Sequence, residues 1–192
     1  MLSLLDQTAN RDLYAQALVS AVAVTEGYLI DMLSLILRAF PMKIGDPDKK
    51  VDLNIVLQAK CLDGVLEEVI SRKIRSVFYA TPAEYFEEFE KILSISLPDD
   101  RKAAYCEVKA TRDIYVHNGG IVNYVYLQKA GELARAKDGE LINIDERYVS
   151  ESIALMRVMV RLTADRLRGK YKESEELDTY LSARIDQYLG TD

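Results

Sequence analysis

Apolar residues recur at intervals of three and four positions over most of the 192-residue chain, which leaves few folds open to it. This spacing lines one face of an α-helix with apolar side chains, whereas a half-buried strand needs strict alternation. The longest run ends before Pro41, because a proline ring removes a backbone donor and disfavours helix at the residue before it. With so little strand pattern, we expect an all-α fold, an antiparallel helical bundle of about six helices.

Capping residues and helix breakers divide this pattern into segments. Thr81-Pro82-Ala83-Glu84 is a capping box with proline at the first helical position. Two acids after Pro98 suit the first turn of another helix, and Gly119-Gly120 ends that helix. The predicted helices run from about Thr8 to Ala39, Asp52 to Tyr79, Thr81 to Leu93, Pro98 to His117, Asp145 to Arg168 and Ser174 to Gly190.

The first two helices have apolar faces that we expect to be buried. Their members are Leu13, Ala17, Val24, Tyr28, Met32, Leu35 and Ile36 in the first, and Leu53, Val56, Leu57, Leu62, Val65, Leu66, Val69, Ile70, Ile74, Val77 and Phe78 in the second.

Two stretches do not fit the helical pattern. Residues 41–50 read as a loop from their Pro, Gly and Asp content. Residues 121–143 leave helix and extended structure open in their first part. Asp138-Gly139 predicts a turn, and Glu140 to Ile144 predicts a short extended stretch.

Composition and charge narrow the class of protein. The chain is 49% hydrophobic and 29% charged, which is typical of a folded soluble protein, and we expect one domain over residues 1–192. One histidine, His117, and two cysteines 45 positions apart, Cys61 and Cys106, cannot form a Cys/His zinc site of known spacing. We expect no metal and no cofactor, although counting leaves an all-carboxylate magnesium site open.

The compartment predicted from the sequence is the cytoplasm. The start, from Met1 to Asp6, lacks the basic region of a signal peptide. Glu26, Gly27 and Asp31 interrupt the most apolar stretch, so we expect no membrane helix. Two distant cysteines without a signal peptide suggest reduced thiols.

One constellation carries chemistry: Arg112, Asp113, His117 and Asn118 at the end of a predicted helix. Arg112 and His117 lie five positions apart, so on a regular helix their side chains point about 140° apart. They converge only where the helix is ending. The helix dipole stabilises a cation at His117, in the last turn.

An arginine and a histidine suffice for metal-free cleavage of RNA. His117 would act as general base toward the 2′-hydroxyl or as general acid toward the leaving 5′-oxygen. Arg112 would stabilise the negative charge that develops on the phosphate. The ordinary alternative is a histidine that only caps a helix C-terminus.

The stretch from Arg112 to Gly120 resembles the HEPN superfamily (higher eukaryotes and prokaryotes nucleotide-binding domain). Ribonuclease members carry Arg-x(4–6)-His near a helix end, commonly with a polar residue after the arginine and often with an asparagine after the histidine. Here these residues are Arg112, Asp113, His117 and Asn118. A long helical pair before the motif and a helix after a Gly-containing loop are also similar.

The resemblance implies a homodimer in which two copies of the motif form one composite cleft. It implies an RNA substrate, with Asp113 orienting Arg112 or His117. Asn118 would either position the phosphate or help to end the helix. Relatives include toxins of toxin–antitoxin modules and phage-defence nucleases, so an antitoxin or regulatory protein is a further expected partner. In one toxin subgroup, the antitoxin attaches a nucleotide to a tyrosine two places after the histidine. This chain has Gly119 at that position, so we do not expect this form of regulation.

The net charge of −6 means that any RNA-binding surface must be local. Candidate basic patches are Arg72, Lys73 and Arg75, and the run of Arg157, Arg161, Arg166, Arg168, Lys170 and Lys172. The leading hypothesis is therefore a metal-independent RNA endonuclease. The alternative is a non-catalytic helical dimer module that binds a partner protein or a nucleotide.

Overall fold

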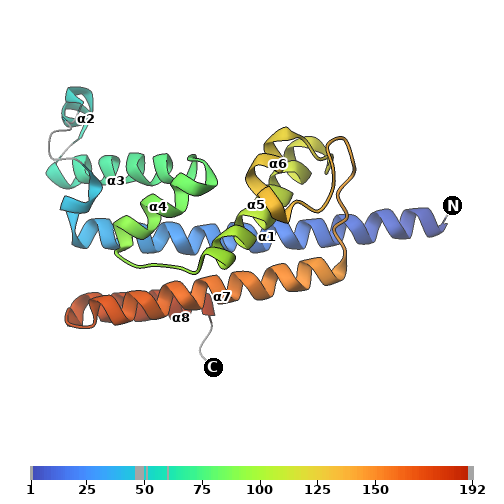
Figure 1. Cartoon of the computed structure of the whole chain (residues 1–192). Helices are drawn as coiled ribbons and strands as arrows, with labels where there is room; N and C mark the ends of the chain where they lie inside the picture. The colour runs from blue at the N-terminus through green and yellow to red at the C-terminus, as the bar shows by residue number, and fades with distance from the viewer. Residues whose placement is uncertain (1, 46–49, 51, 60, 190–192) are drawn as a thin grey trace. The chain divides into compact units, whose positions relative to one another are not determined.

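The computed structural model describes residues 2–45, 50, 52–59 and 61–189, and eight α-helices account for most of them (Figure 1). The all-α class predicted from the sequence is confirmed. In the part of the chain that is described, extended pairing is confined to one antiparallel bridge between Ile121 and Leu141. In order, the elements are α1 (Leu2–Ala39), the 3-10 helix η1 (Pro41–Ile44), α2 (Leu53–Gln58), α3 (Leu62–Phe78), α4 (Pro82–Leu93), α5 (Asp99–Asn118), α6 (Tyr124–Ala130), the 3-10 helix η2 (Gly131–Leu133), α7 (Glu146–Tyr171) and α8 (Glu175–Leu189).

The contacts between residues group into two compact units. Unit 1 combines Met1–Gly27 with Leu97–Thr163, and unit 2 combines Tyr28–Ser96 with Ala164–Asp192. Helices α1 and α7 therefore contribute a part to each unit, while α5 and α6 belong to unit 1 and α3, α4 and α8 to unit 2. The single domain expected over residues 1–192 stays a prediction.

Unit 1 is built around α5, against which α6 packs (Figure 1). The segment after α5 is pinned to the segment before α7, because the Val122 amide donates to the Glu140 carbonyl (2.8 Å) and the Ile142 amide donates to the Gly120 carbonyl (2.9 Å). The stretch left open by the sequence thus contains α6 and η2, followed by irregular chain with the predicted turn at Asp138 and Gly139. The buried core comprises Ala15, Leu18, Val22, Val108, Ala110, Ile114, Val122, Tyr126, Ala130, Ile142, Ile144, Val149 and Met156.

Unit 2 buries aromatic and aliphatic side chains from α1, α3, α4, α7 and α8. Tyr85 and Phe86 of α4 meet edge to face with ring centroids 4.7 Å apart, a favoured aromatic geometry. Helix α4 begins with the predicted capping box, in which the Thr81 amide donates to the Glu84 carboxylate (3.2 Å). Fully buried residues of this unit include Tyr28, Leu29, Met32, Leu33, Ile36, Leu37, Ile70, Phe89 and Leu93.

The prediction of one helix from Asp52 to Tyr79 is wrong. Ala59 and Cys61 have extended backbone, which separates the six-residue α2 from α3. Sequence periodicity continues across the break, so the pattern itself contained no sign of it. With this division and the added α6, the described residues contain eight α-helices instead of about six.

Several residues predicted to be buried are exposed. Leu13 and Val24 lie on the outside of α1, whose buried stripe instead passes through Ala15, Leu18 and Val22. On α2 and at the start of α3, the apolar residues predicted to face the core are mostly in solvent, with Leu62 82% exposed. The others are Leu53, Val56 and Leu57.

Three further expectations concern the ends of elements. The loop predicted at residues 41–50 begins with η1, and its residues 46–49 lie outside the described part of the chain. Gly190, predicted to end the last helix, also lies outside it. Helix α7 begins where predicted, because the Asp145 carboxylate accepts a hydrogen bond from the Tyr148 amide (2.9 Å) at its N-terminus.

Within the described residues, one helical segment, Asp12–Ala39, is long and apolar enough to cross a membrane. Length and composition alone give this result, and a helix in the core of a soluble protein meets the same criteria. The expectation that the chain has no membrane helix remains a prediction.

Candidate functional site

The four residues singled out by the motif lie on the last two turns of α5. This helix begins after Pro98 with Asp99 and Asp100 in its first turn, as the sequence predicts. It ends at Gly119, where φ is +60°. Glycine adopts this left-handed conformation at little cost, and a side chain there would be strained. The motif is therefore presented at a defined helix end.

His117 is exposed in the last turn of α5. Among the residues that the structure describes, no side chain forms a hydrogen bond or ion pair with its imidazole. The ring is accessible to an incoming ligand. A general acid or base requires this accessibility.

Arg112 is held by two carboxylates. Its guanidinium lies 2.7 Å from Glu26 of α1 and 3.1 Å from Asp113, and its side chain is 19% exposed. Its Nε is buried and has no hydrogen-bond partner among the described atoms. Asp113 thus lies where the sequence predicted a residue that orients Arg112.

Two lysines complete this group of charges. Lys109 lies 2.6 Å from Glu26, and Lys129 of α6 lies 3.1 Å from Asp113. We call these five residues (Glu26, Lys109, Arg112, Asp113 and Lys129) the Arg112 cluster. It contains three cations and two anions, all of them partly exposed, and so carries one net positive charge.

Sequence reasoning missed Glu26, Lys109 and Lys129. Glu26 is 86 residues from Arg112, so no local motif connects the two. The available signal was its position as a charge within the most apolar stretch of the chain, because a partly buried charge requires a partner.

The structure does not bring Arg112 and His117 together within one chain. Helix α5 continues through both positions, so the two side chains point about 140° apart. Asn118 has a defined structural contact, since its side-chain amide donates to the Ile121 carbonyl (2.7 Å). Of the two roles considered for Asn118, this contact matches the one that ends the helix and directs the chain after it.

A second polar group, the Glu107 cluster, lies on the same helix. Glu107 is only 5% exposed. One of its carboxylate oxygens accepts from the hydroxyls of Thr111 (2.7 Å) and Tyr126 (3.1 Å) and from Nε of Arg135 (3.0 Å). The other accepts from the Tyr148 hydroxyl (2.8 Å). This carboxylate is fully satisfied and connects α5 to α6, α7 and the segment between them.

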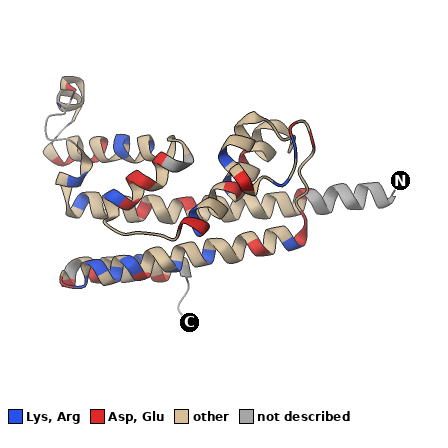
Figure 2. Ribbon diagram, in the orientation of Figure 1, with Lys and Arg blue, Asp and Glu red and all other residues tan. Residues whose placement is uncertain are grey.

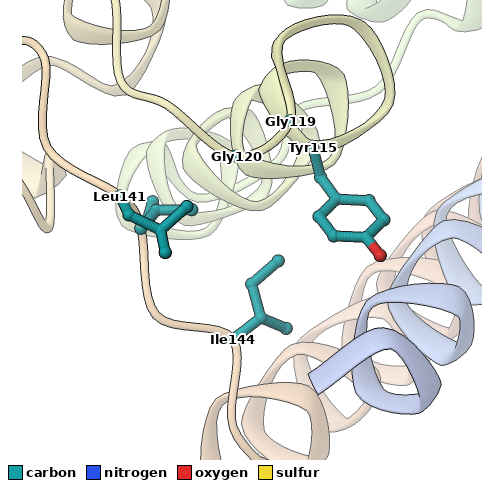
Figure 3. Close-up of a pocket in the computed structure, with 6 residues that line it drawn as sticks. Tyr115, Gly119, Gly120, Leu141 and Ile144 are labelled. Atoms are coloured by element: carbon teal, nitrogen blue, oxygen red, sulfur yellow. The ribbon is translucent and has the colours of Figure 1, made fainter. Parts of the chain in front are cut away.

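A shallow apolar hollow lies beside the end of α5 (Figure 3). The ring of Tyr115 and the side chains of Leu141 and Ile144 point into it, and the backbone of Gly119 and Gly120 forms one wall. The Tyr115 hydroxyl donates to Asp12 of α1 (3.2 Å). The residues that line the hollow include no charged side chain, so the hollow itself supplies no catalytic group.

Apolar side chains are exposed near His117. Val116 precedes it on α5, Ile121 follows the glycine pair, and Tyr124 and Val125 begin α6. Tyr124 is 73% exposed and Val125 52%. Apolar residues gathered in one short stretch of surface are typical of an interaction site.

The two basic patches named from the sequence differ in their partners. Arg72 and Arg75 are paired with Glu68 (2.8 and 3.4 Å), and Lys73 with Glu88 (2.7 Å). On α7, by contrast, four basic residues are exposed and have no ion-pair partner among the described residues: Arg157, Arg161, Arg166 and Lys170. The same holds for Lys172, just after the helix. Figure 2 shows basic residues gathered toward the C-terminal end of α7.

Metal and thiol chemistry have little support in the described ranges. No group of three or more His, Cys, Asp and Glu side chains is placed there to hold a metal ion. Both cysteines are free. Burial raises the pKa of the Cys106 thiol to about 11, which keeps it protonated and a poor nucleophile.

Comparison with known proteins adds no family. A scan against family models, a search of curated proteins and a search of solved structures each returned no match.

Proposed function

We propose that this chain is a metal-independent RNA endonuclease whose composite site forms when two copies pair through the end of α5. One observation carries the proposal. An exposed histidine lies in the last turn of α5, five positions after an arginine whose guanidinium two carboxylates hold in place. His117 supplies the proton transfer, and Arg112 supplies the positive charge. Asp113 and Asn118 support them, as orienting residue and as helix-end residue.

The reaction requires no group that the chain lacks. The RNA 2′-oxygen attacks the adjacent phosphorus while His117 of one copy takes the hydroxyl proton. The phosphorus–5′-oxygen bond breaks, and the leaving oxygen takes a proton from the partner's His117. The products are a 2′,3′-cyclic phosphate and a 5′-hydroxyl. DNA lacks the 2′-hydroxyl and would not be cleaved.

Arg112 keeps the capacity to bind a phosphate within its ion pairs. A guanidinium has five N–H groups, and the contacts to Glu26 and Asp113 occupy one on each terminal nitrogen. The second N–H of each terminal nitrogen is available for a phosphate oxygen. The two carboxylates reduce the freedom of the side chain, which lowers the entropy lost on binding.

Pairing of two copies explains how Arg112 and His117 can act on one phosphate although their side chains point apart within one chain. Val116, Ile121, Tyr124 and Val125 are exposed, lie within eight positions of His117 in the sequence, and offer apolar surface for a dimer contact. In a two-fold arrangement, Arg112 of one copy and the partner's His117 can face the same phosphate. A cytoplasmic toxin or phage-defence effector, held in check by an antitoxin or another regulator, is the biological role we propose.

Cleavage of end-labelled RNA in EDTA tests this function. We expect cleavage to persist with a chelator, to leave a 2′,3′-cyclic phosphate, and to fall by about 100-fold or more in His117→Ala. Lys137→Ala is the matched control, because Lys137 is exposed in the same unit and lies outside the motif. Loss of activity on chelation, or unchanged cleavage in His117→Ala, would overturn the proposal.

The pairing of Arg112 with Glu26 and Asp113 also favours a second candidate, a non-catalytic helical dimer module. In that case the ion pairs serve the fold alone. The purified protein would then turn over no RNA at any pH between about 5 and about 8, and Arg112→Ala would still form dimers in sedimentation experiments. Cleavage that depends on His117 excludes this candidate.

A further inference from the structure

The end of α7 in unit 2 carries a dense run of positive charge. From Arg166 to Lys172 the sequence is Arg-Leu-Arg-Gly-Lys-Tyr-Lys, with four cations and no acid, in a chain whose net charge is −6. Arg166, Lys170 and Lys172 are exposed. Arg166 and Lys170 are four residues apart and therefore share one face of the helix.

These three cations differ from other basic residues of unit 2 in having no anionic partner in the described part of the chain. Arg38, Arg72, Lys73, Arg75, Lys91 and Arg184 each lie within 3.4 Å of a carboxylate. Arg168, within the run, is 3.4 Å from Asp186. Because paired charges cancel at a distance, the uncompensated positive charge of this run comes from Arg166, Lys170 and Lys172.

The segment is held in place by the residue between the two lysines. The Tyr171 hydroxyl donates to the Leu93 carbonyl (3.0 Å), and its ring stacks on Phe40 with centroids 5.4 Å apart. Since Tyr171 is anchored, Lys170 and Lys172 leave the chain from a fixed backbone. A fixed set of charges loses less entropy on binding than a flexible tail does.

Lys43 of η1 adds a cation to the same neighbourhood. Its Nζ donates to the Ile92 carbonyl (2.9 Å) and to the Ser94 hydroxyl (2.5 Å). Partial burial lowers the pKa of Lys43, and the positive charge of Lys170 lowers it further. Lys43 lies beside the run, because it binds the Ile92 carbonyl, next to the Leu93 carbonyl that Tyr171 binds.

Nearby acids limit this surface. Asp165 precedes the run, and Glu173 and Glu175 follow it, all three of them exposed. Asp186 pairs with Arg168. In the described part of the chain none of these acids pairs with Arg166, Lys170 or Lys172, so the three cations stay available to a ligand.

We infer that Arg166, Lys170 and Lys172, with Lys43, form a binding surface for the phosphodiester backbone of single-stranded RNA. The choice of RNA as the polyanion rests on the proposed function, whose candidate catalytic residues all belong to unit 1. Tyr171, the aromatic residue of the run, is buried, so bases have no stacking partner in it. The surface therefore holds RNA without regard to sequence and lengthens the time that the substrate spends on the enzyme.

Binding of a fluorescent RNA of about 20 nucleotides tests the surface, measured by anisotropy between about 50 and about 200 mM salt in the His117→Ala background. We expect the combined change Arg166→Gln, Lys170→Gln and Lys172→Gln to weaken binding about tenfold or more. Each lost phosphate contact lowers the slope of log affinity against log salt by about 0.7, so the slope should fall by about 2. Circular dichroism verifies that the variant is folded.

The matched control is the combined change Arg72→Gln, Lys73→Gln and Arg75→Gln. It removes the same number of charges from the same unit, but these are paired with Glu68 and Glu88. We expect RNA affinity to change less than about twofold. Equal weakening in both variants, which net charge alone would produce, overturns the inference, as does unchanged binding when the α7 charges are removed.

Two further measurements distinguish this inference from others. The first is binding to vesicles that contain phosphatidylserine. If the wild-type protein binds these vesicles but not RNA, and the α7 variant no longer binds the vesicles, the inference is overturned in favour of a membrane surface. Cleavage of a dinucleotide tests the catalytic site alone, because so short a substrate gains nothing from a second surface. The α7 variant with His117 intact should cleave a dinucleotide at the wild-type rate and long RNA more slowly.

Discussion

Glu107 and Arg112 are five residues apart on α5 and both carry charge, but they differ in burial and in their bonding partners. The Glu107 carboxylate is almost fully buried and accepts hydrogen bonds from Thr111, Tyr126, Arg135 and Tyr148. The Arg112 side chain is 19% exposed, and its terminal nitrogens contact Glu26 and Asp113. A buried, fully bonded charge fixes the relative positions of chain segments, while an accessible one is available to a ligand.

The difference follows from the neighbours that each side chain meets. The hydroxyls of Tyr126 and Tyr148 donate to Glu107, and the guanidinium of Arg135 lies over the Tyr148 ring, 3.4 Å from its centroid. The Arg112 cluster consists of charged side chains that are each between 19 and 33% exposed. We therefore expect mutations in the Glu107 cluster to affect stability and mutations in the Arg112 cluster to affect function.

The largest expected effect is that of Glu107→Ala. It leaves Arg135 without its counter-charge and several buried donors without an acceptor, so we expect the free energy of unfolding to fall by about 4 kcal/mol. Urea denaturation measures this change. Glu26→Ala is the matched control, since it removes a carboxylate from the accessible cluster, and its cost should be about 1 kcal/mol. Equal costs in the two variants would contradict the comparison.

A smaller effect is expected for Tyr148→Phe, which removes one donor to Glu107. Hydrogen bonds to charged groups contribute about 2 kcal/mol, and the loss should be of that size. Tyr124→Phe serves as control, because Tyr124 is exposed and should tolerate the change within about 0.5 kcal/mol. A similar loss in both variants would show that the Glu107 contact contributes nothing of its own.

The difference in stability between the wild-type protein and Tyr148→Phe should depend on pH. Burial, followed by the nearby Glu107 carboxylate, raises the pKa of Tyr148 above its ordinary value of 10.0. The unfolded chain then ionises first, so the stability that Tyr148 contributes is complete below pH 10 and declines as the pH rises further. The difference in stability between wild type and Tyr148→Phe should accordingly shrink above pH 10.

The smallest expected effect is that of Glu26→Gln on RNA cleavage. The neutral amide holds Arg112 less firmly than the carboxylate does, so kcat should fall about tenfold, or about 1.4 kcal/mol, with KM unchanged. Urea denaturation should detect a loss of no more than about 1 kcal/mol. An unchanged kcat would remove Glu26 from the site and make the Arg112 cluster as purely structural as the Glu107 cluster.

Local signals in the sequence predicted much of the fold. The capping box at Thr81, the acids after Pro98 and the glycine pair at 119–120 set helix boundaries that the structure confirms. Periodicity failed where burial depends on distant chain, as at Leu62, whose apolar side chain has no core to enter. The break between α2 and α3 escaped notice because neither proline nor glycine marks it.

For the candidate site, the motif alone named Arg112, Asp113, His117 and Asn118. It also suggested that Asp113 orients Arg112 or His117, and Asp113 lies 3.1 Å from the Arg112 guanidinium. Glu26 and Lys129 lay beyond its reach, because they come from helices that only folding brings to α5. The two basic patches looked equivalent as sequence, and their difference emerged only from which acids lie beside them.

The sequence by itself determined the all-helical class, most helix ends and the position of the single histidine in a last turn, since propensity, capping and helix breaking act within a few residues of the chain. Only the tertiary structure decided that Glu107 is buried while Arg112 is partly exposed, and that the exposed cations of α7 lack the anionic partners that those of α3 possess. Burial and charge pairing depend on side chains many residues apart, and a linear pattern contains no information about which of them will meet.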